Sequence, residues 1–251
     1  MTRQVWRLDP ATYPRHCLHQ GDRVWPESNC SVDLWIELLY TRGLEPLAAL
    51  PFTFALDFEG DQWTFFKFPL GDLVGLYGVD VIELSVWRPL IAHVDEQLGM
   101  ARPCIVEVDA YYLPDTSGTS YHDEHVKTSI AMQALDMDAR RLGYFHNAGY
   151  YELEGTDFNG LFRLDEGSID PRHLPPYVEV VKFGNARLDA GTIVKKSIEL
   201  LRGYLSRPGD NPFRRYSDRL VTDLHWLANQ PLSRFHARRA APRTSARGGP
   251  V

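Results

Sequence analysis

The stretch WPESNCSVDLWIELLY, residues 25–40, places a cysteine between turn-forming residues and a long apolar run. The run predicts a helix over residues 31–41, because its apolar side chains lie on nearly every side. Only Asp33 and Glu37, four residues apart, give it a polar stripe. A helix that is apolar on nearly all sides is buried in the core. We therefore expect Cys30 at the N-terminal end of a buried helix.

A cysteine at the start of a helix has two interpretations. The free N–H groups and the dipole of a helix N-terminus stabilise a thiolate, which favours a nucleophile. The residues before Cys30 form a cap-like segment, and the Asn29 amide and the Cys30 backbone N–H would be two donors to an oxyanion. A single cysteine in this position is nevertheless more often a packing residue. Residues elsewhere in the chain must therefore distinguish a nucleophile from a packing residue.

The composition describes an ordinary globular protein. The chain has 251 residues with 44% hydrophobic and 24% charged residues, enough for one large domain or two small ones. Its formal net charge of −6 gives no general attraction to nucleic acid. The N-terminal residues have no apolar run, so we expect no signal peptide, and no apolar run in the sequence is long enough for a membrane span. Three scattered cysteines do not form a disulfide framework, so we expect a cytoplasmic protein with reduced thiols.

The patterning divides the chain into an α+β part, residues 1–185, a helical extension, residues 186–233, and a disordered tail, residues 234–251. After an extended arm and the first helix, the sheet of the first part is predicted to be mostly antiparallel. The predicted elements are a hairpin over 51–69, a short helix over 72–77, strands over 79–87, 104–113, 125–135, 140–153 and 175–183, a helix over 89–100, and helices over 192–205 and 211–227.

Two polar residues are expected near one another on the predicted sheet. A turn over residues 136–139 places His125 opposite residue 150 or 151. Asn147 then lies one or two pairs nearer the turn and within reach of the imidazole, while His146 points to the opposite face. With Cys30, these residues form the ordered Cys–His–Asn set of papain-like enzymes. The chain has nine histidines, so His125 alone carries little weight.

Aromatic residues and further histidines surround the proposed site. If they have a functional role, the aromatic residues form a groove for the acceptor beside the cysteine. If they have only a structural role, they belong to the core or to a face of the sheet. They are Trp87, Tyr111, Tyr112, Tyr121, Tyr144, Tyr150 and Tyr151. A rival interpretation makes the histidines of HDEH, residues 122–125, metal ligands together with His146. No metalloprotease helix motif is present, so we expect no metal.

Several long blocks resemble a known family. NCSVDLWIELLY, FTFALDFEGDQWTFFKFP, EVDAYYLPDTSGTSY, HVKTSIA and GYFHNAGYYELEG are similar to domain-of-unknown-function family 1839, a proteobacterial group, over about residues 20–230. The arrangement more distantly resembles the acyltransferases of the butirosin biosynthesis protein H group and the double-glycine leader peptidases. That likeness implies a papain-like fold with a Cys–His–Asp/Asn site.

The resemblance also implies an activity. Members of the family are encoded beside amino acid:carrier protein ligases and small acyl carrier proteins. This setting implies a thiol-dependent acyltransferase that takes an acyl or aminoacyl group from a carrier-protein thioester and passes it to a small amine or hydroxyl acceptor. The chain would need no cofactor of its own, since phosphopantetheine is carried by the partner protein. No nucleic acid or membrane partner is expected.

The resemblance assigns roles to individual residues and leaves alternatives open. Cys30 would be the nucleophile, His125 the base and Asn147 the residue that orients it. The leader peptidases usually have Asp where this chain has Asn147, and Val24 stands where papain-like enzymes have a glutamine. A cysteine peptidase or amidase with the same residues, and a non-catalytic binding protein with the same fold, remain alternatives.

Overall fold

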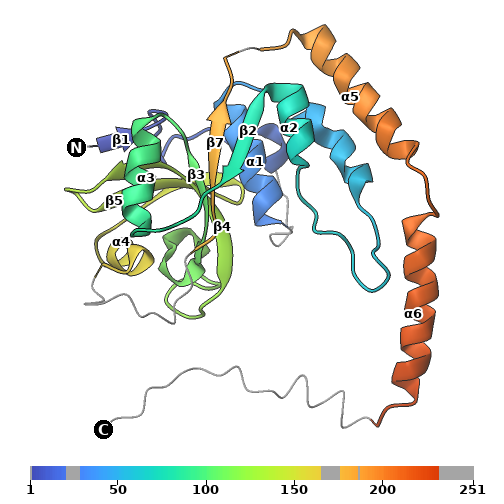
Figure 1. Cartoon of the computed structure of the whole chain (residues 1–251). Helices are drawn as coiled ribbons and strands as arrows, with labels where there is room; N and C mark the ends of the chain where they lie inside the picture. Colours follow the sequence, from blue (N-terminus) through green and yellow to red (C-terminus); the bar gives the residue numbers. More distant parts are fainter. Residues whose placement is uncertain (1, 21–28, 165–175, 186, 232–251) are drawn as a thin grey trace. The chain divides into compact units, whose positions relative to one another are not determined.

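The computed structural model describes residues 2–20, 29–164, 176–185 and 187–231 (Figure 1). Contacts divide the chain into two compact units, which are described separately below. Unit 1 comprises Met1–Ala55 and Phe66–Ser206, and unit 2 comprises Leu56–Phe65 and Arg207–Val251. The predicted disordered tail, residues 234–251, lies outside the described residues, and the predicted division at residues 185 and 233 stays a prediction.

Unit 1 is built on one antiparallel sheet. The strand order is β2-β7-β3-β4-β5-β6, and β1 pairs with β4 off this path. Every strand pair that is described is antiparallel, and a register shift between Met132 and Ala134 bends β4 against β5. The strands are β1 Thr2–Gln4, β2 Val79–Glu83, β3 Cys104–Asp109, β4 Lys127–Asp136, β5 Arg141–His146, β6 Gly149–Glu154 and β7 Val178–Phe183.

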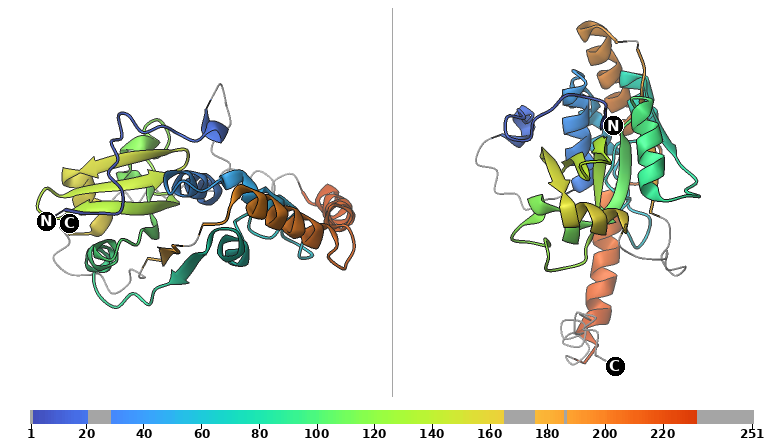
Figure 2. Two further views of the ribbon diagram at one scale, coloured as in Figure 1. Left: turned by 90° about the horizontal axis from the view of Figure 1, so that it is seen from above. Right: turned by 90° about the vertical axis from the view of Figure 1, so that its left-hand side faces the viewer.

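Helices cover both faces of this sheet (Figures 1 and 2). Because side chains alternate along a strand, Ala131 and Phe145 point to one face and Ile130 and Tyr144 to the other. On the first face lie α1 Cys30–Thr41, α2 Leu70–Tyr77 and a 3₁₀ segment, Pro46–Ala55. On the second face lie α3 Leu90–Gly99 and α4 Gly155–Phe162. The sheet therefore separates α1 from α3.

Helix α1 is buried as its sequence predicts. Leu34, Leu38 and Leu39 are fully inaccessible to solvent. Burying a leucine side chain contributes roughly 1.5–3 kcal/mol, so α1 holds much of the core on its side of the sheet. Asn29 caps the helix, and Arg42 ends it by donating its backbone N–H to the carbonyl of Leu38.

Two amphipathic helices follow the sheet in the sequence. Helix α5, Ala190–Leu205, belongs to unit 1 and contacts the 3₁₀ segment. Asp189 caps it by accepting from the Thr192 N–H. Figure 1 shows α5 in orange after β7.

Unit 2 joins helix α6, Pro212–Ala228, to the loop 56–65. Phe58 and Trp63 form an isolated bridge in the loop. The rings of both contact Tyr216. The Arg215 guanidinium donates to the Phe58 carbonyl at 2.6 Å and pairs with Asp57. An aromatic cluster and the half-buried Arg215 thus fix the loop on the helix.

The structure confirms a mixed α+β protein with a mostly antiparallel sheet, and it corrects three predicted elements. The hairpin predicted over 51–69 is confirmed only around its turn, where Phe58 and Trp63 form an antiparallel bridge. Its first arm is wrong: a 3₁₀ segment runs through Pro51, and Phe52 packs on Phe66 and Phe68 beneath α1. Proline has no N–H to give to a ladder, which disfavours a strand there. The 3₁₀ turn Ala110–Tyr112 shortens the strand predicted over 104–113.

The third correction concerns the strand predicted over 140–153. It is two strands, β5 and β6, joined by a tight turn at Asn147 and Ala148. Asn147 has φ +46°, a left-handed conformation that asparagine tolerates better than most residues. Helix α4 follows β6 and was not predicted. No helix in the described segments is long and apolar enough to cross a membrane.

Candidate functional site

Cys30 is the first residue of α1 and is partly exposed. Asn29 caps the helix, with its Oδ1 accepting from the Val32 N–H at 3.1 Å. Its Nδ2 donates to the carbonyl of Phe66 at 2.5 Å. One Nδ2 hydrogen of Asn29 is therefore engaged, and its predicted role as an oxyanion donor would use the second one. The other donors at this helix end are backbone N–H groups of the first turn, which have no partner inside a helix.

His125 lies just before β4, and its orienting partner is Asp109. The imidazole Nδ1 is 2.6 Å from Oδ2 of Asp109, at the end of β3. The ring stacks on Tyr111 with centroids 4.5 Å apart and an angle of 14° between the planes. Asp109 is itself held, since its Oδ1 accepts from the Tyr111 N–H. The pair fixes the orientation of the imidazole. The other ring nitrogen, Nε2, belongs to a side chain that is 69% exposed.

The His125–Asp109 pair and α1 lie on the same face of the sheet. Ile105 and Ala131 belong to the core beneath α1. The ladder between β3 and β4 continues to Val126, whose carbonyl accepts from the Ala110 N–H at 2.8 Å. Because alternate residues share a face, Asp109 on β3 and His125 before β4 share the face of Ile105 and Ala131.

Asn147 is not opposite His125 in the sheet, because the chain turns there. Tyr150 pairs with Phe145, so the predicted pairing of His125 with residue 150 or 151 is wrong. Asn147 is 8% exposed, and its Oδ1 has no hydrogen-bond partner among the described residues. A buried carbonyl oxygen without a partner is uncommon in proteins. Its contribution to a site stays a prediction.

His146 points to the opposite face, as predicted, and enters a buried polar chain. Its Nδ1 lies 2.6 Å from Oδ2 of Asp115, and its Nε2 lies 2.9 Å from Oγ1 of Thr128. The Tyr144 hydroxyl donates to the other Asp115 oxygen at 2.6 Å. Burial and the Asp115 charge raise the pKa of Tyr144, so this phenol stays protonated. These hydrogen bonds tie the loop after β3 to β4 and β5.

The histidines of the rival metal site do not converge. His122 Nε2 is held by Asp157 at 2.7 Å, whereas His125 and His146 are held by Asp109 and Asp115. Within the segments that the structure describes, no three His, Cys, Asp or Glu residues are arranged to bind a metal ion. The structure therefore gives the metal-site interpretation no support.

The aromatic residues of the predicted groove are spread over several places. Tyr111 stacks on His125, and Tyr121 stacks on His122 with centroids 4.0 Å apart. Tyr150 is buried on the α1 side, where its hydroxyl accepts from Gln133. The other members lie elsewhere: Trp87 is 79% exposed beside His93 of α3, and Tyr112, Tyr144 and Tyr151 belong to the core on the α3 side. The set therefore does not form one groove beside His125, although Tyr111 stacks on its ring.

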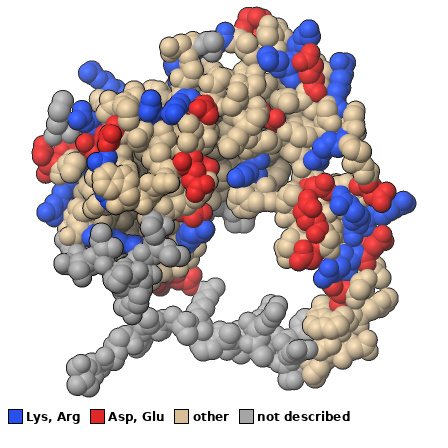
Figure 3. Space-filling view, viewed as in Figure 1, with Lys and Arg blue, Asp and Glu red and all other residues tan. Residues whose placement is uncertain are grey.

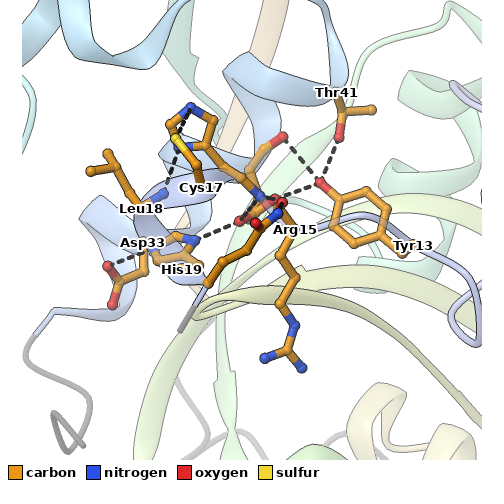
Figure 4. A network of polar contacts seen from close by, with 10 residues as sticks. Tyr13, Arg15, Cys17, Leu18, His19, Asp33 and Thr41 are labelled. Atoms are coloured by element: carbon orange, nitrogen blue, oxygen red, sulfur yellow. Dashed lines mark hydrogen bonds and ion pairs between the residues drawn. The ribbon is translucent and has the colours of Figure 1, made fainter. Parts of the chain in front are cut away.

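A buried polar network lies on the polar stripe of α1 (Figure 4). Glu37, which is inaccessible to solvent, accepts from the Tyr13 hydroxyl at 2.7 Å and from the His16 backbone N–H at 3.1 Å. His19 bridges the stripe, with Nδ1 2.5 Å from Glu37 Oε1 and Nε2 3.2 Å from Asp33 Oδ1. The network holds the N-terminal arm on the helix that begins with Cys30. The spacing of Asp33 and Glu37 predicts the stripe, but their partners lie far from them in the sequence.

The electrostatics of this network favour a charged imidazole. Burial by itself lowers the pKa of His19, but the hydrogen bonds and charges of Asp33 and Glu37 outweigh burial and raise it to about 9. Burial also raises the pKa of Tyr13, so its hydroxyl remains a donor. A buried carboxylate is tolerated when a cation and hydrogen-bond donors surround it, as they surround Glu37.

The fold and site define an α+β protein with a cysteine at the start of a helix that packs on an antiparallel sheet. A family model described as the DUF1839 N-terminal domain matches residues 14–183, which is more than half of the chain. The protein therefore belongs to the DUF1839 family. No curated protein matches the chain.

Proposed function

We propose that the protein is a thiol-dependent acyltransferase with a papain-like arrangement of helix and sheet. Cys30 accepts an acyl or aminoacyl group from a carrier-protein thioester, and the group then passes to an amine or hydroxyl acceptor. His125, oriented by Asp109, serves as the base. We also propose a cytoplasmic location, where thiols stay reduced.

The chemistry has two balanced steps. The Cys30 sulfur attacks the thioester carbonyl, a new C–S bond forms, and the carrier phosphopantetheine leaves as a thiol that carries the proton released by Cys30. In the second step the acceptor nitrogen or oxygen attacks the acyl-cysteine, its proton passes to the imidazole, and the Cys30 sulfur leaves and recovers a proton. Backbone N–H groups in the first turn of α1 are the donors available to the oxyanion.

One observation carries the proposal: the helix that presents Cys30 and the His125–Asp109 pair share one face of the sheet. Partial exposure of Cys30 supports access by a thioester, and the cap formed by Asn29 leaves the helix dipole directed at the thiol. The carboxylate on Nδ1 of His125 is the arrangement that fixes the tautomer of a catalytic imidazole. Tyr111, stacked on the ring, restricts its rotation.

The test is the transfer of an aminoacyl group to the protein. The full chain is incubated with a carrier protein loaded with a radiolabelled aminoacyl thioester, and the adduct is located by intact-mass analysis and peptide mapping. We expect one adduct on Cys30, which Cys30→Ala removes. Cys17→Ala is the matched control, because Cys17 is an exposed thiol outside the proposed site. Absence of an adduct, or an adduct that survives Cys30→Ala, contradicts the proposal.

The acceptor separates the transferase from the hydrolase alternative. If the adduct persists in buffer and is released by an added amine, the protein transfers. If it decays to the free acid in buffer alone, or if peptides are cleaved without a carrier protein, the protein is a peptidase or amidase. If the Cys30 thiol is no more reactive than a free thiol and accepts no acyl group, a non-catalytic binding protein is the better description.

A further inference from the structure

A second candidate site runs along the exposed face of α3, on the opposite side of the sheet from α1. Ala92, Asp95, Glu96 and Gly99 follow one another at helical spacing and line a hollow with a volume of about 510 Å³. Two small residues of this face leave room that longer side chains would fill. Figure 3 shows basic and acidic side chains interspersed over the part of the surface that α3 occupies.

Two arginines form the basic side of this hollow. Arg3 reaches the hollow from β1. Its guanidinium carbon lies about 3.6 Å from the position that a Cβ on Gly99 would occupy. Arg88 precedes α3 and stacks over the Trp87 ring at 5.3 Å. The Nε of Arg88 is buried and has no hydrogen-bond partner among the described residues. Leaving a buried donor unpaired is costly, so the neighbouring residues do not fully satisfy this guanidinium.

Two carboxylates form the acidic side. Asp95 is 3.4 Å from Nε of Arg3, at the long end for a hydrogen bond, and Glu96 pairs with Arg88 while its side chain is 57% exposed. Met100 and Met137 supply apolar wall on one side. A second hollow of about 290 Å³ shares Arg88 and Glu96 and extends to Trp87 and His93.

We propose that this hollow binds a free α-amino acid as a zwitterion, with its carboxylate on Arg88 and Arg3 and its ammonium on Asp95 and Glu96. A simple anion would meet two carboxylates, and a simple cation would meet two guanidinium groups. A zwitterion instead finds a partner of opposite charge for its carboxylate and for its ammonium group. The volume is within the range of small-ligand sites, about 300–1,000 Å³. The methionines favour an unbranched apolar side chain.

Calorimetric titration of the full chain with L-methionine tests the proposal. Two derivatives test each end of the ligand: N-acetyl-L-methionine lacks the ammonium, and L-methioninamide lacks the carboxylate. We expect L-methionine to bind and both derivatives to bind at least about 10-fold more weakly, because each loses charge-assisted hydrogen bonds. No heat of binding up to ~10 mM, or equal binding of either derivative, overturns the proposal.

Variants assign the binding to the hollow. Arg88→Gln and Glu96→Gln should each weaken L-methionine binding by about 10-fold or more. Ala92→Leu, which fills the hollow without changing charge, should abolish binding. Matched controls are Arg219→Gln, an ion-paired surface arginine on α6, and Ala190→Leu at the start of α5. Unchanged binding in Ala92→Leu, or equal weakening in the controls, overturns the assignment.

The site is independent of the proposed acyl transfer. Cys30→Ala should bind L-methionine as the unmodified protein does, whereas it should form no acyl adduct. The two ideas can therefore fail separately. A protein that forms the Cys30 adduct but shows no L-methionine binding contradicts only the amino-acid site.

Discussion

The imidazole of His19 lies against the buried carboxylate of Glu37, with Nδ1 2.5 Å from Oε1. Glu37 is on the helix that begins with Cys30, and His19 is on the arm that precedes it. Because the carboxylate is inaccessible to solvent and the imidazole side chain is 3% exposed, the pair is a charged contact inside the protein. It is one of the polar links that hold the arm on the helix that begins with Cys30.

The first prediction concerns pH. His19 has a pKa raised to about 9 in the folded protein, above the ordinary value of 6.5. Its contribution to the free energy of unfolding is therefore fully present below about pH 6.5 and is lost as pH rises through about 9. We expect a loss of roughly 3 kcal/mol over that interval, measured by urea unfolding at a series of pH values. His19→Gln should be less stable at pH 6 and should lack this part of the pH dependence. Identical pH profiles for both proteins would contradict the prediction.

The second prediction concerns Glu37. Glu37→Ala should lower the free energy of unfolding by about 3–5 kcal/mol, because it leaves His19, the Tyr13 hydroxyl and the His16 N–H without their acceptor. Equilibrium unfolding in urea measures the change. Asp223→Ala is the matched control, since Asp223 forms an exposed pair with Arg219 four residues away and its loss should have no measurable effect. Equal effects of both substitutions would show that Glu37 has no special structural role.

The third prediction concerns the contact between β5 and β6. A Cβ on Gly143 would lie 2.1 Å from the Tyr150 hydroxyl oxygen and 3.1 Å from the Ala134 Cβ. Gly143→Ala should therefore displace Tyr150, disturb its hydrogen bond from Gln133 and destabilise the fold by about 1–3 kcal/mol. Gly71→Ala in α2 meets no atom within 4 Å and should be neutral or slightly stabilising. Thermal unfolding distinguishes the two, and a Gly143→Ala protein as stable as the unmodified one would show that the strand contact is not tight.

Local sequence patterns predicted α1 and most of the sheet correctly. The apolar run of α1 is continuous, and its cap at Asn29 depends only on neighbouring residues. The predicted register between β4 and β5 is also close to the observed one, because the turn after Asp136 depends only on neighbouring residues. The turn at Asn147 was missed, since Asn-Ala lacks the glycine that marks the commonest tight turns. Because this turn is not predicted, Tyr150 is expected on the same strand as Phe145, whereas it lies opposite Phe145 on β6.

The partners of the polar residues could not be predicted from local patterns. Asp109 holds His125 because a 3₁₀ turn after β3 and the loop 113–126 bring together residues sixteen positions apart. Similarly, His19 finds Asp33 and Glu37 because the arm packs on α1. A pattern of charges along one element indicates which side chains need partners. Which partner satisfies them depends on tertiary packing.

The fourth prediction concerns the three cysteines. Burial raises the pKa of the Cys104 thiol to about 12, and the residue is inaccessible to solvent, so it should resist alkylation in the folded protein. Cys30, at a helix N-terminus and partly exposed, should react with iodoacetamide at pH 7 faster than glutathione does. Peptide mapping of partially alkylated protein gives the rate at each thiol, with Cys17 as the exposed reference. A Cys30 that reacts no faster than Cys17 would favour a packing role.

The last prediction separates the two Asp–His pairs that flank Tyr111. If Asp109 orients the catalytic imidazole, Asp109→Asn should lower the rate of aminoacyl transfer by about 100-fold or more, in the range usual for loss of acid–base catalysis. Asp157→Asn is the matched control, because Asp157 also pairs with an imidazole, through Nε2 of His122, and His122 has no role in the proposed reaction. We expect its transfer rate to stay within about 3-fold of the unmodified protein, since general acid–base catalysis is intact. If both variants transfer at the same rate, His125 is not the base, and another histidine on the α1 side must be sought.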